Sequence, residues 1–136
     1  MRILIVEDDY TSRIVLLRQL LPYGQTQVAV NGKEAVELFG AAISAGTPFD
    51  LVCLDIMLPG MDGQAVLREL RAIESSAGPA PGRTPARIIM TTALNDRTNV
   101  VTAIKSCDGY LVKPVDRAKL MACLQGFGFA APASPR

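Results

Sequence analysis

Residues 49–63 read FDLVCLDIMLPGMDG, an apolar run that ends in an aspartate and passes into a loop with proline and glycine. The apolar run predicts a strand over Phe49–Leu54, covered on both faces, with Asp55 at its end. A loop over Leu58–Gly63 follows. Beyond the loop, three apolar residues recur at helical spacing: Val66, Leu70 and Ile73. The segment therefore predicts a strand, a loop and a helix in succession.

The same alternation of apolar runs and helical patterns extends in both directions. Four more strands are predicted, at Arg2–Val6, Gln27–Val30, Arg87–Met90 and Tyr110–Val112. Four more helices are predicted, at Thr11–Leu21, from a cap at Asn31 or Gly32 to Ile43, at Asp96–Ser106 and at Asp116–Leu124. Five strands alternating with five helices favour an α/β fold, a doubly wound parallel sheet with helices on both faces.

Length and local composition predict one domain. The chain has 136 residues, the size of one ordinary domain. Residues 75–85 (SSAGPAPGRTP) are rich in glycine, proline and serine, so we expect a flexible surface insertion there. We expect the domain to span residues 1–126 and residues 127–136 to form a flexible tail.

The composition excludes several classes of protein. With 49% apolar and 20% charged residues, the chain can bury a core, which excludes wholesale disorder. The net charge of +1 lacks the basic excess of a nucleic-acid-binding domain. No apolar run reaches the ~20 residues of a membrane helix, and the first residues lack the apolar segment of a signal peptide, so we expect a cytoplasmic protein without membrane association.

The residue types that are scarce restrict the chemistry. The chain has no histidine, which excludes Ser-His-Asp and Cys-His catalysis and histidine-ligated metals. Its three cysteines are scattered, and we interpret them as buried apolar side chains in a reducing compartment. Any chemistry must therefore come from carboxylates, lysine, hydroxyls and the backbone.

Polar residues follow four of the five predicted strands. In chain order they are Glu7, Asp8 and Asp9, then Asp55, then Thr91 and Thr92, then Lys113. Each alone is ordinary turn or cap chemistry, but the carboxyl ends of parallel strands meet at one edge, where ligands bind. Crowded carboxylates repel one another unless a cation such as Mg²⁺ joins them. With a lysine and a hydroxyl nearby, the set suits a phosphoryl group that an aspartate attacks in line.

The sequence resembles a known family at these strand ends, the receiver domains of two-component response regulators. Four motifs carry the resemblance, namely residues 5–9 (IVEDD), 54–63 (LDIMLPGMDG), 89–93 (IMTTA) and 109–114 (GYLVKP). They occur in the family's order, and the resemblance covers about residues 2–125. It implies a flavodoxin-like fold with strand order 2-1-3-4-5.

The resemblance also implies a phosphoacceptor and a metal site. Asp55 is similar to the aspartate that receives the phosphoryl group. Asp8 and Asp55 are implied to ligate Mg²⁺ directly and Glu7 through water. The main-chain carbonyl of Met57 is implied to be another ligand. Lys113 resembles the lysine that pairs with a phosphoryl oxygen, and a cis bond to Pro114 is expected.

Three further positions match the parts of a switch. Thr92 resembles the switch hydroxyl, and Ala93 the small residue that leaves room for phosphate. Tyr110 resembles an aromatic rotamer switch, with a half-buried core aromatic as the alternative. Asp9, next to the acid pair, is expected to be exposed or to cap a helix, and Thr91 to point to the face of its strand opposite Thr92.

The resemblance implies a phosphorylation-dependent signalling switch rather than an enzyme, although the chain could catalyse its own transfer and slow hydrolysis. The resemblance implies that a sensor histidine kinase or a histidine phosphotransfer protein is the donor, and the chain has no histidine of its own to carry the phosphoryl group. The downstream effector is expected to be a protein that the sequence does not specify. Lys119 replaces the acidic residue of the winged-helix subfamily, and only a short tail follows the last predicted helix. We therefore expect a stand-alone receiver without direct DNA binding.

Three other functions fit less well. A phosphatase of the haloacid-dehalogenase type would use Asp55 as nucleophile, but it needs an aspartate two residues later, where Met57 stands. A phosphate-binding loop at Gly32-Lys33 fails because Glu34, not serine or threonine, follows the lysine. A flavin module shares the fold class, but its phosphate would be repelled by the acids after the first strand.

Overall fold

The computed structural model describes residues 1–78, 84–93 and 107–129. Its centre is a five-stranded sheet in the order β2-β1-β3-β4-β5, and every neighbouring pair is parallel. The strands are β1 (Arg2–Val6), β2 (Gln25–Ala29), β3 (Leu51–Asp55), β4 (Arg87–Thr92) and β5 (Gly109–Val112). The fold class and the strand order expected from the sequence are both confirmed.

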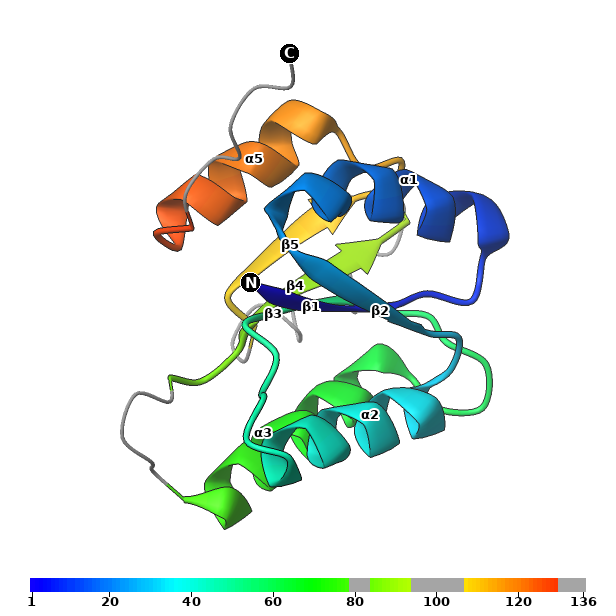
Figure 1. The fold of residues 1–136 in the computed structure, drawn as a ribbon. Coiled ribbons are helices and arrows are strands. Elements are labelled where there is room, and N and C mark those ends of the chain that lie inside the picture. Colours follow the sequence, from blue (N-terminus) through cyan, green and yellow to red (C-terminus); the bar gives the residue numbers. More distant parts are fainter. Residues whose placement is uncertain (79–83, 94–106, 130–136) are drawn as a thin grey trace.

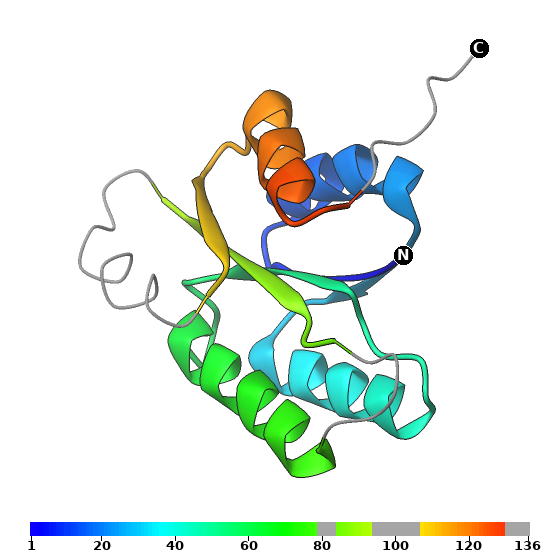
Figure 2. The ribbon, with the colours of Figure 1, turned by 90° about the vertical axis from the view of Figure 1, so that its left-hand side faces the viewer.

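Helices cover both faces of the sheet (Figure 1). On one face lie α1 (Tyr10–Leu20) and α5 (Arg117–Gly126), and on the other lie α2 (Gly32–Ser44) and α3 (Gly63–Ala77). Figure 2 shows the two helix pairs on opposite sides of the twisted sheet. A short 3-10 helix, η1 (Leu21–Tyr23), follows α1. The helix expected over Asp96–Ser106 lies outside the described residues. Within the described ranges, no helix has the length and apolar character needed to cross a membrane.

Each of these four α-helices begins at a side chain that caps it. Asp9, Asn31, Asp62 and Asp116 each accept a hydrogen bond from the backbone N–H three residues later. Each bond satisfies one of the free N–H groups of the first helical turn. The structure therefore assigns the cap of α2 to Asn31 rather than Gly32, and it assigns Asp9 a capping role.

Two apolar clusters fill the space between the sheet and its helices. Successive strand residues point to opposite faces, so alternate residues of one strand belong to different clusters. Leu54 packs with α2 and α3, whereas Cys53 packs with α1 and α5. Every residue of β3 is buried, as the apolar run predicted. Burial raises the pKa of the Cys53 thiol to about 12, which agrees with its interpretation as an apolar side chain.

Every strand except β1 differs in extent from the sequence prediction, and the differences at the start of β2 and the end of β4 have a clear cause. β2 begins at Gln25 instead of Gln27, and the Gln25 N–H donates to the Met1 carbonyl at 2.9 Å. β4 continues past Met90 to Thr92, because Thr91 and Thr92 pair with Leu111 and Val112 of β5. Backbone pairing determines both boundaries, whereas the sequence pattern followed only the apolar side chains.

The last described residues pack against the domain. The Phe127 N–H donates to the carbonyls of Cys123 and Leu124 at the end of α5. The rings of Phe127 and Phe129 meet edge to face, with centroids 6.2 Å apart, and both pack on the cluster beneath α1 and α5. Residues 130–136 lie outside the described residues. The position at which a tail begins therefore stays a prediction.

Candidate functional site

Asp55 is the last residue of β3, the central strand, and lies at the carboxyl edge of the sheet. The residue is only 4% exposed. Its Oδ1 accepts a hydrogen bond from the Met57 N–H at 3.0 Å, and its Oδ2 lies 2.8 Å from Lys113 Nζ. A donor on each oxygen fixes the orientation of this carboxylate. Asp55 is therefore held in place by the protein before any ligand arrives.

Two more carboxylates reach Asp55 from the end of β1. Glu7 is fully buried and Asp8 is exposed, and oxygens of Glu7, Asp8 and Asp55 all lie within 4.8 Å of one another. Glu7 Oε2 accepts the Asp9 N–H at 3.2 Å. Glu7 Oε1 lies 2.6 Å from Lys113 Nζ, yet among the described residues it has no well-aligned hydrogen-bond donor. The three acids with this under-bonded buried oxygen form a candidate cation site.

Burial and neighbouring charges determine the protonation of the cluster. Burial, followed by the Asp55 carboxylate beside it, raises the pKa of Glu7 from 4.5 to about 7. Burial of Lys113 disfavours its charge, but the carboxylates of Asp55 and Glu7 outweigh that effect and raise the pKa of Lys113. Lys113 is therefore charged at neutral pH. Because the pKa of Glu7 lies near neutral pH, part of the protein carries a proton on this carboxyl there, and a bound cation would displace that proton.

Lys113 approaches the carboxylates from β5, at the edge of the sheet. Its backbone N–H donates to the Thr92 carbonyl at 2.7 Å, which extends the pairing of β4 with β5 by one residue. The Lys113-Pro114 peptide bond is cis, as the resemblance implied. The sheet thus brings together Asp55 and Lys113, which are 58 residues apart in the sequence.

The switch residues proposed from the sequence are placed as follows. Thr92 ends β4 and is buried, and its hydroxyl donates to the Ala93 carbonyl at 3.2 Å. Within the described part of the chain, no hydrogen bond joins Thr92 to Asp55. Thr91 is the register partner of Asp55 in the neighbouring strand. Successive strand residues point to opposite faces of the sheet, so Thr91 and Thr92 point to opposite faces, as expected. Tyr110 is 43% exposed. Their roles in switching stay predictions.

The loops on either side of the cluster contribute Asp9 and Met57. Asp9 accepts the Ser12 N–H at 2.8 Å, and this bond lowers the pKa of the Asp9 carboxyl. Asp9 therefore belongs to the cap of α1 rather than to the acidic cluster. Met57 contributes its N–H to Asp55, while its side chain is 59% exposed. The metal contact expected through the Met57 carbonyl stays a prediction.

Two residues to which the sequence analysis gave no role support the site. Arg13 donates from Nη1 to the carbonyls of Glu7 and Asp8, at 3.3 and 3.4 Å, and so braces the loop that carries both acids. Gly63 begins α3 where a Cβ atom would collide with the backbone carbonyl of Asp55. Glycine is required by this close approach. The proline- and glycine-rich loop before α3 was the only sequence signal for Gly63, and nothing signalled Arg13.

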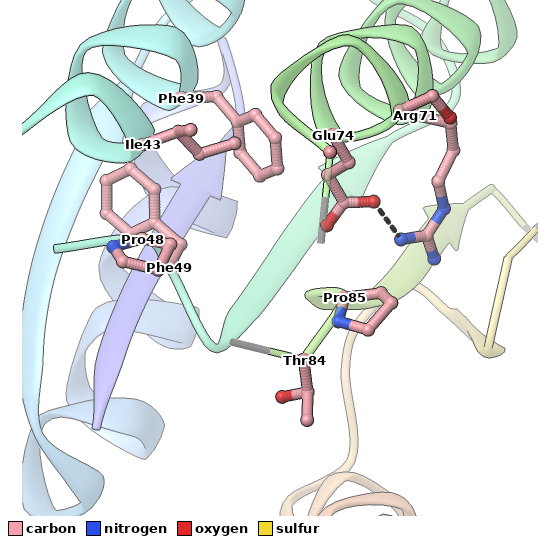
Figure 3. A pocket seen from close by; sticks show the side chains of 10 residues that line it. Phe39, Ile43, Pro48, Phe49, Arg71, Glu74, Thr84 and Pro85 are labelled. Atoms are coloured by element: carbon pink, nitrogen blue, oxygen red, sulfur yellow. Dashed lines mark hydrogen bonds and ion pairs between the residues drawn. The ribbon is translucent and has the colours of Figure 1, made fainter. Parts of the chain in front are cut away.

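A separate hollow lies at the other end of the strands, beside residues that precede β3 and β4 (Figure 3). It measures about 550 Å³, and Phe39, Ile43, Phe49, Arg71, Glu74 and Pro85 are among the residues that line it. Arg71 and Glu74 are paired with each other at 2.8 Å, and Glu74 accepts the Ala86 N–H at 2.7 Å. The polar groups of this hollow therefore hold the chain just before β4. The side chains proposed for phosphoryl chemistry, Asp55 and Lys113, lie at the acidic cluster and not in this hollow.

Comparison with known sequences points to one family. The family model for the response regulator receiver domain matches residues 3–125. The chain is 33% identical over 125 residues to the probable transcriptional regulator ycf27 of Cyanidium caldarium, covering 90% of this chain and 44% of that protein. It is 32% identical over 123 residues to the transcriptional regulatory protein AruR of Pseudomonas aeruginosa, covering 89% and 46%. The chain thus spans less than half the length of these curated relatives.

Solved structures agree on the fold. The N-terminal domain of a response regulator/sensory box/GGDEF three-domain protein from Carboxydothermus hydrogenoformans superposes with a TM-score of 0.71 at 26% identity, over 92% of that chain and 93% of this one. A BeF3-activated DrrB receiver domain gives 0.71 at 22% identity, over 95% of that chain and 93% of this one, a likeness in fold alone. Since the family model matches nearly the whole folded domain and the strand order agrees, this chain belongs to the response regulator receiver domain family.

Proposed function

We propose that this chain is a phosphorylation-dependent signalling switch in which Asp55 accepts a phosphoryl group from a phosphohistidine on another protein. The observation that carries the proposal is the position of the Asp55 carboxylate, 2.8 Å from Lys113 Nζ and within 4.8 Å of oxygens of Glu7 and Asp8. A fixed carboxylate beside an ammonium group and a candidate cation site is the arrangement that phosphoryl transfer requires. Membership of the receiver family supports a signalling role rather than a metabolic one.

In the transfer, a carboxylate oxygen of Asp55 attacks phosphorus and an O–P bond forms. The P–N bond of the donor breaks, and its electron pair returns to the imidazole nitrogen. The Lys113 ammonium, which now contacts Asp55 Oδ2, then offsets the charge of a phosphoryl oxygen. In the slow hydrolysis of the phosphorylated protein, water attacks phosphorus, inorganic phosphate leaves and the Asp55 carboxylate is restored. Both reactions use groups of this chain.

Magnesium is the cation that the acidic cluster fits best. The donor set consists of carboxylate oxygens, which hard divalent cations prefer, and the buried Glu7 Oε1 lacks a well-aligned donor among the described residues. Asp8 and Asp55 would hold the ion directly, Glu7 through water, and Met57 through its carbonyl. When bound, Mg²⁺ neutralises charge on the phosphoryl oxygens. The protein's part is to hold the carboxylates together despite their repulsion.

Thr92 and Tyr110 are the groups through which phosphorylation would change the surface. Among the described residues, the Thr92 hydroxyl bonds to the adjacent Ala93 carbonyl alone, at 3.2 Å, a long bond that costs little to exchange for a phosphoryl oxygen. Tyr110 is 43% exposed, so its ring is not fixed in the core, and the proposal has it turn into the space that Thr92 vacates. A local change in charge at Asp55 would then alter the surface around β5.

The proposed partners are a phosphoryl donor and a downstream effector. Membership of the receiver family supports a sensor histidine kinase or a histidine phosphotransfer protein as donor, and the chain has no histidine of its own for that step. The altered surface would engage a downstream effector protein. A net charge of +1 gives no basic excess for DNA, so no direct DNA contact is proposed. Three free cysteines, one of them buried, fit a reducing compartment, which supports a cytoplasmic location.

Labelling with a small phosphodonor tests the proposal. Purified protein is incubated with radiolabelled acetyl phosphate and Mg²⁺, beside an EDTA control, and the label retained by the protein is counted. We expect Mg²⁺-dependent label in the wild type and in Asp9→Asn, which alters an exposed acid outside the cluster. We expect none in Asp55→Asn, which is nearly isosteric but lacks the nucleophile. Undiminished labelling of Asp55→Asn would place the acceptor elsewhere.

A further inference from the structure

Gln19, near the end of α1, reaches across to the segment that follows Lys113. Its Nε2 donates to the Val115 carbonyl at 3.1 Å, a bond that joins residues 96 apart in the sequence. Its other amide atom, Oε1, is buried and accepts no hydrogen bond from the described residues. A buried acceptor without a donor destabilises the folded protein, and leucine at the same place would avoid that cost. Packing alone therefore does not account for a glutamine at this position.

The segment Lys113–Val115 is anchored at its two ends and loosely packed between them. At one end the Lys113 N–H donates to the Thr92 carbonyl, and at the other Val115 is buried in the cluster beneath α1 and α5. Between these anchors, a small cavity of about 70 Å³ separates the segment from α1, with Val15 and Leu16 on its helical wall. Apolar packing therefore does not by itself set the distance between α1 and this segment.

The position of this segment matters because Lys113 serves two carboxylates. Its ammonium lies 2.6 Å from Glu7 Oε1 and 2.8 Å from Asp55 Oδ2. A displacement of the backbone at Lys113 would change both distances. The strength of the electrostatic interaction between Lys113 and Asp55 thus depends on the position of the Val115 backbone.

We propose that Gln19 is a positioning residue for Lys113. Its amide fixes the Val115 carbonyl relative to α1, and this keeps the Lys113 ammonium against Asp55. The inference rests on the proposed function of Asp55 and Lys113 and adds to it a residue that touches neither the phosphoryl group nor the cation. Its signature is a loss of labelling rate with little change in stability, since Gln19→Leu removes a buried oxygen that has no donor among the described residues, which offsets the loss of the bond to the Val115 carbonyl.

The test compares Gln19→Leu with Arg18→Leu, an exposed neighbour on the same helix. The initial rate of Asp55 labelling by acetyl phosphate is measured with Mg²⁺, together with Mg²⁺ affinity and thermal midpoint. We expect Gln19→Leu to label about tenfold more slowly, because small misplacements of a reacting group cost up to about a hundredfold. Its Mg²⁺ affinity should match the wild type, and its midpoint should change little. Arg18→Leu should match the wild type throughout.

A second variant and a spectroscopic readout complete the test. Gln19→Glu keeps the side-chain length but lacks the donor when ionised, and should label at least as slowly as Gln19→Leu. In both variants the amide proton of Asp116, which shares its peptide unit with the Val115 carbonyl, should shift in the NMR spectrum. Labelling within twofold of wild type in both variants, or slow labelling accompanied by an equally weakened Mg²⁺ affinity, overturns the proposal. Absence of label in the wild type would instead refute the proposed function.

Discussion

The buried carboxylate of Glu7 makes the stability of the apoprotein depend on pH. Its pKa is raised to about 7 in the folded protein, against 4.5 in the unfolded chain, first by burial and then by Asp55. The folded state therefore holds this proton more tightly than the unfolded state. Between these two values the free energy of unfolding must fall as the pH rises, and above the higher value the loss is complete. Glu7→Gln, which imitates the protonated form, should remove this contribution.

The magnitude follows from the two pKa values. One pKa unit corresponds to about 1.4 kcal/mol, so a rise from 4.5 to about 7 amounts to at most about 3–4 kcal/mol at a pH above both. Glu7 is fully buried, so solvent does not screen this effect. The Glu7→Gln substitution keeps the shape of the neutral side chain. We therefore expect this variant to be more stable than the wild type by about 1–3 kcal/mol near pH 8, and the two proteins to be closely similar near pH 5.

Urea unfolding followed by circular dichroism, in EDTA and at a series of pH values, measures this difference. Glu69→Gln is the matched control, because it also removes one negative charge but at an exposed site on α3. The control should follow the wild type across the pH range. If Glu7→Gln and the wild type lost equal stability between about pH 5 and about pH 8, the assignment of a raised pKa to Glu7 would be wrong.

Four further predictions concern the site and its support. Asp8→Ala should weaken Mg²⁺ binding in a calorimetric titration about tenfold or more, because it removes a proposed direct ligand. Lys113→Met should slow labelling by acetyl phosphate about a hundredfold, as expected when a charged group facing the transferred phosphoryl is lost. With beryllofluoride bound, Thr92→Ala should reduce the NMR shift changes around β5 while leaving those at the loop after β3; undiminished changes would refute the switch. Asp108→Ala should lower the free energy of unfolding by about 2 kcal/mol without changing labelling, because the Arg71 guanidinium and the Ile88 N–H lose a partner at 2.9 and 2.8 Å.

The sequence predicted which side chains of the candidate site lie close together, because that site is built from strand ends. Asp55 and Lys113 follow apolar runs, and parallel pairing carries the ends of such runs to one edge of the sheet. Once the strands were recognised, the approach of these two side chains followed from topology, without knowledge of any side-chain rotamer. For the cap of α2 the sequence pattern gave two candidates, Asn31 and Gly32, and the hydrogen bond from the Glu34 N–H to Asn31 decides between them.

Features that depend on distant partners were not predictable in this way. The apolar pattern treats Glu7 and Asp8 alike, although one is fully buried and the other exposed. Arg13 and Gln19 act through backbone carbonyls, and in the case of Gln19 the acceptor is 96 residues away. A side chain that bonds to a backbone carbonyl leaves no residue-type signal at its partner, since every residue carries a carbonyl. The start of β2 at Gln25 was missed because backbone pairing, not burial, decides it.

Chemical trapping of the phosphorylated residue tests the central claim most directly. After incubation with acetyl phosphate, the protein is reduced with sodium borohydride, which converts an aspartyl phosphate to homoserine, and its peptides are sequenced by mass spectrometry. Our account predicts homoserine at position 55 when Mg²⁺ is present and none when EDTA replaces it. Homoserine in place of Asp8 or Asp9, or no homoserine despite retained phosphate, would contradict it.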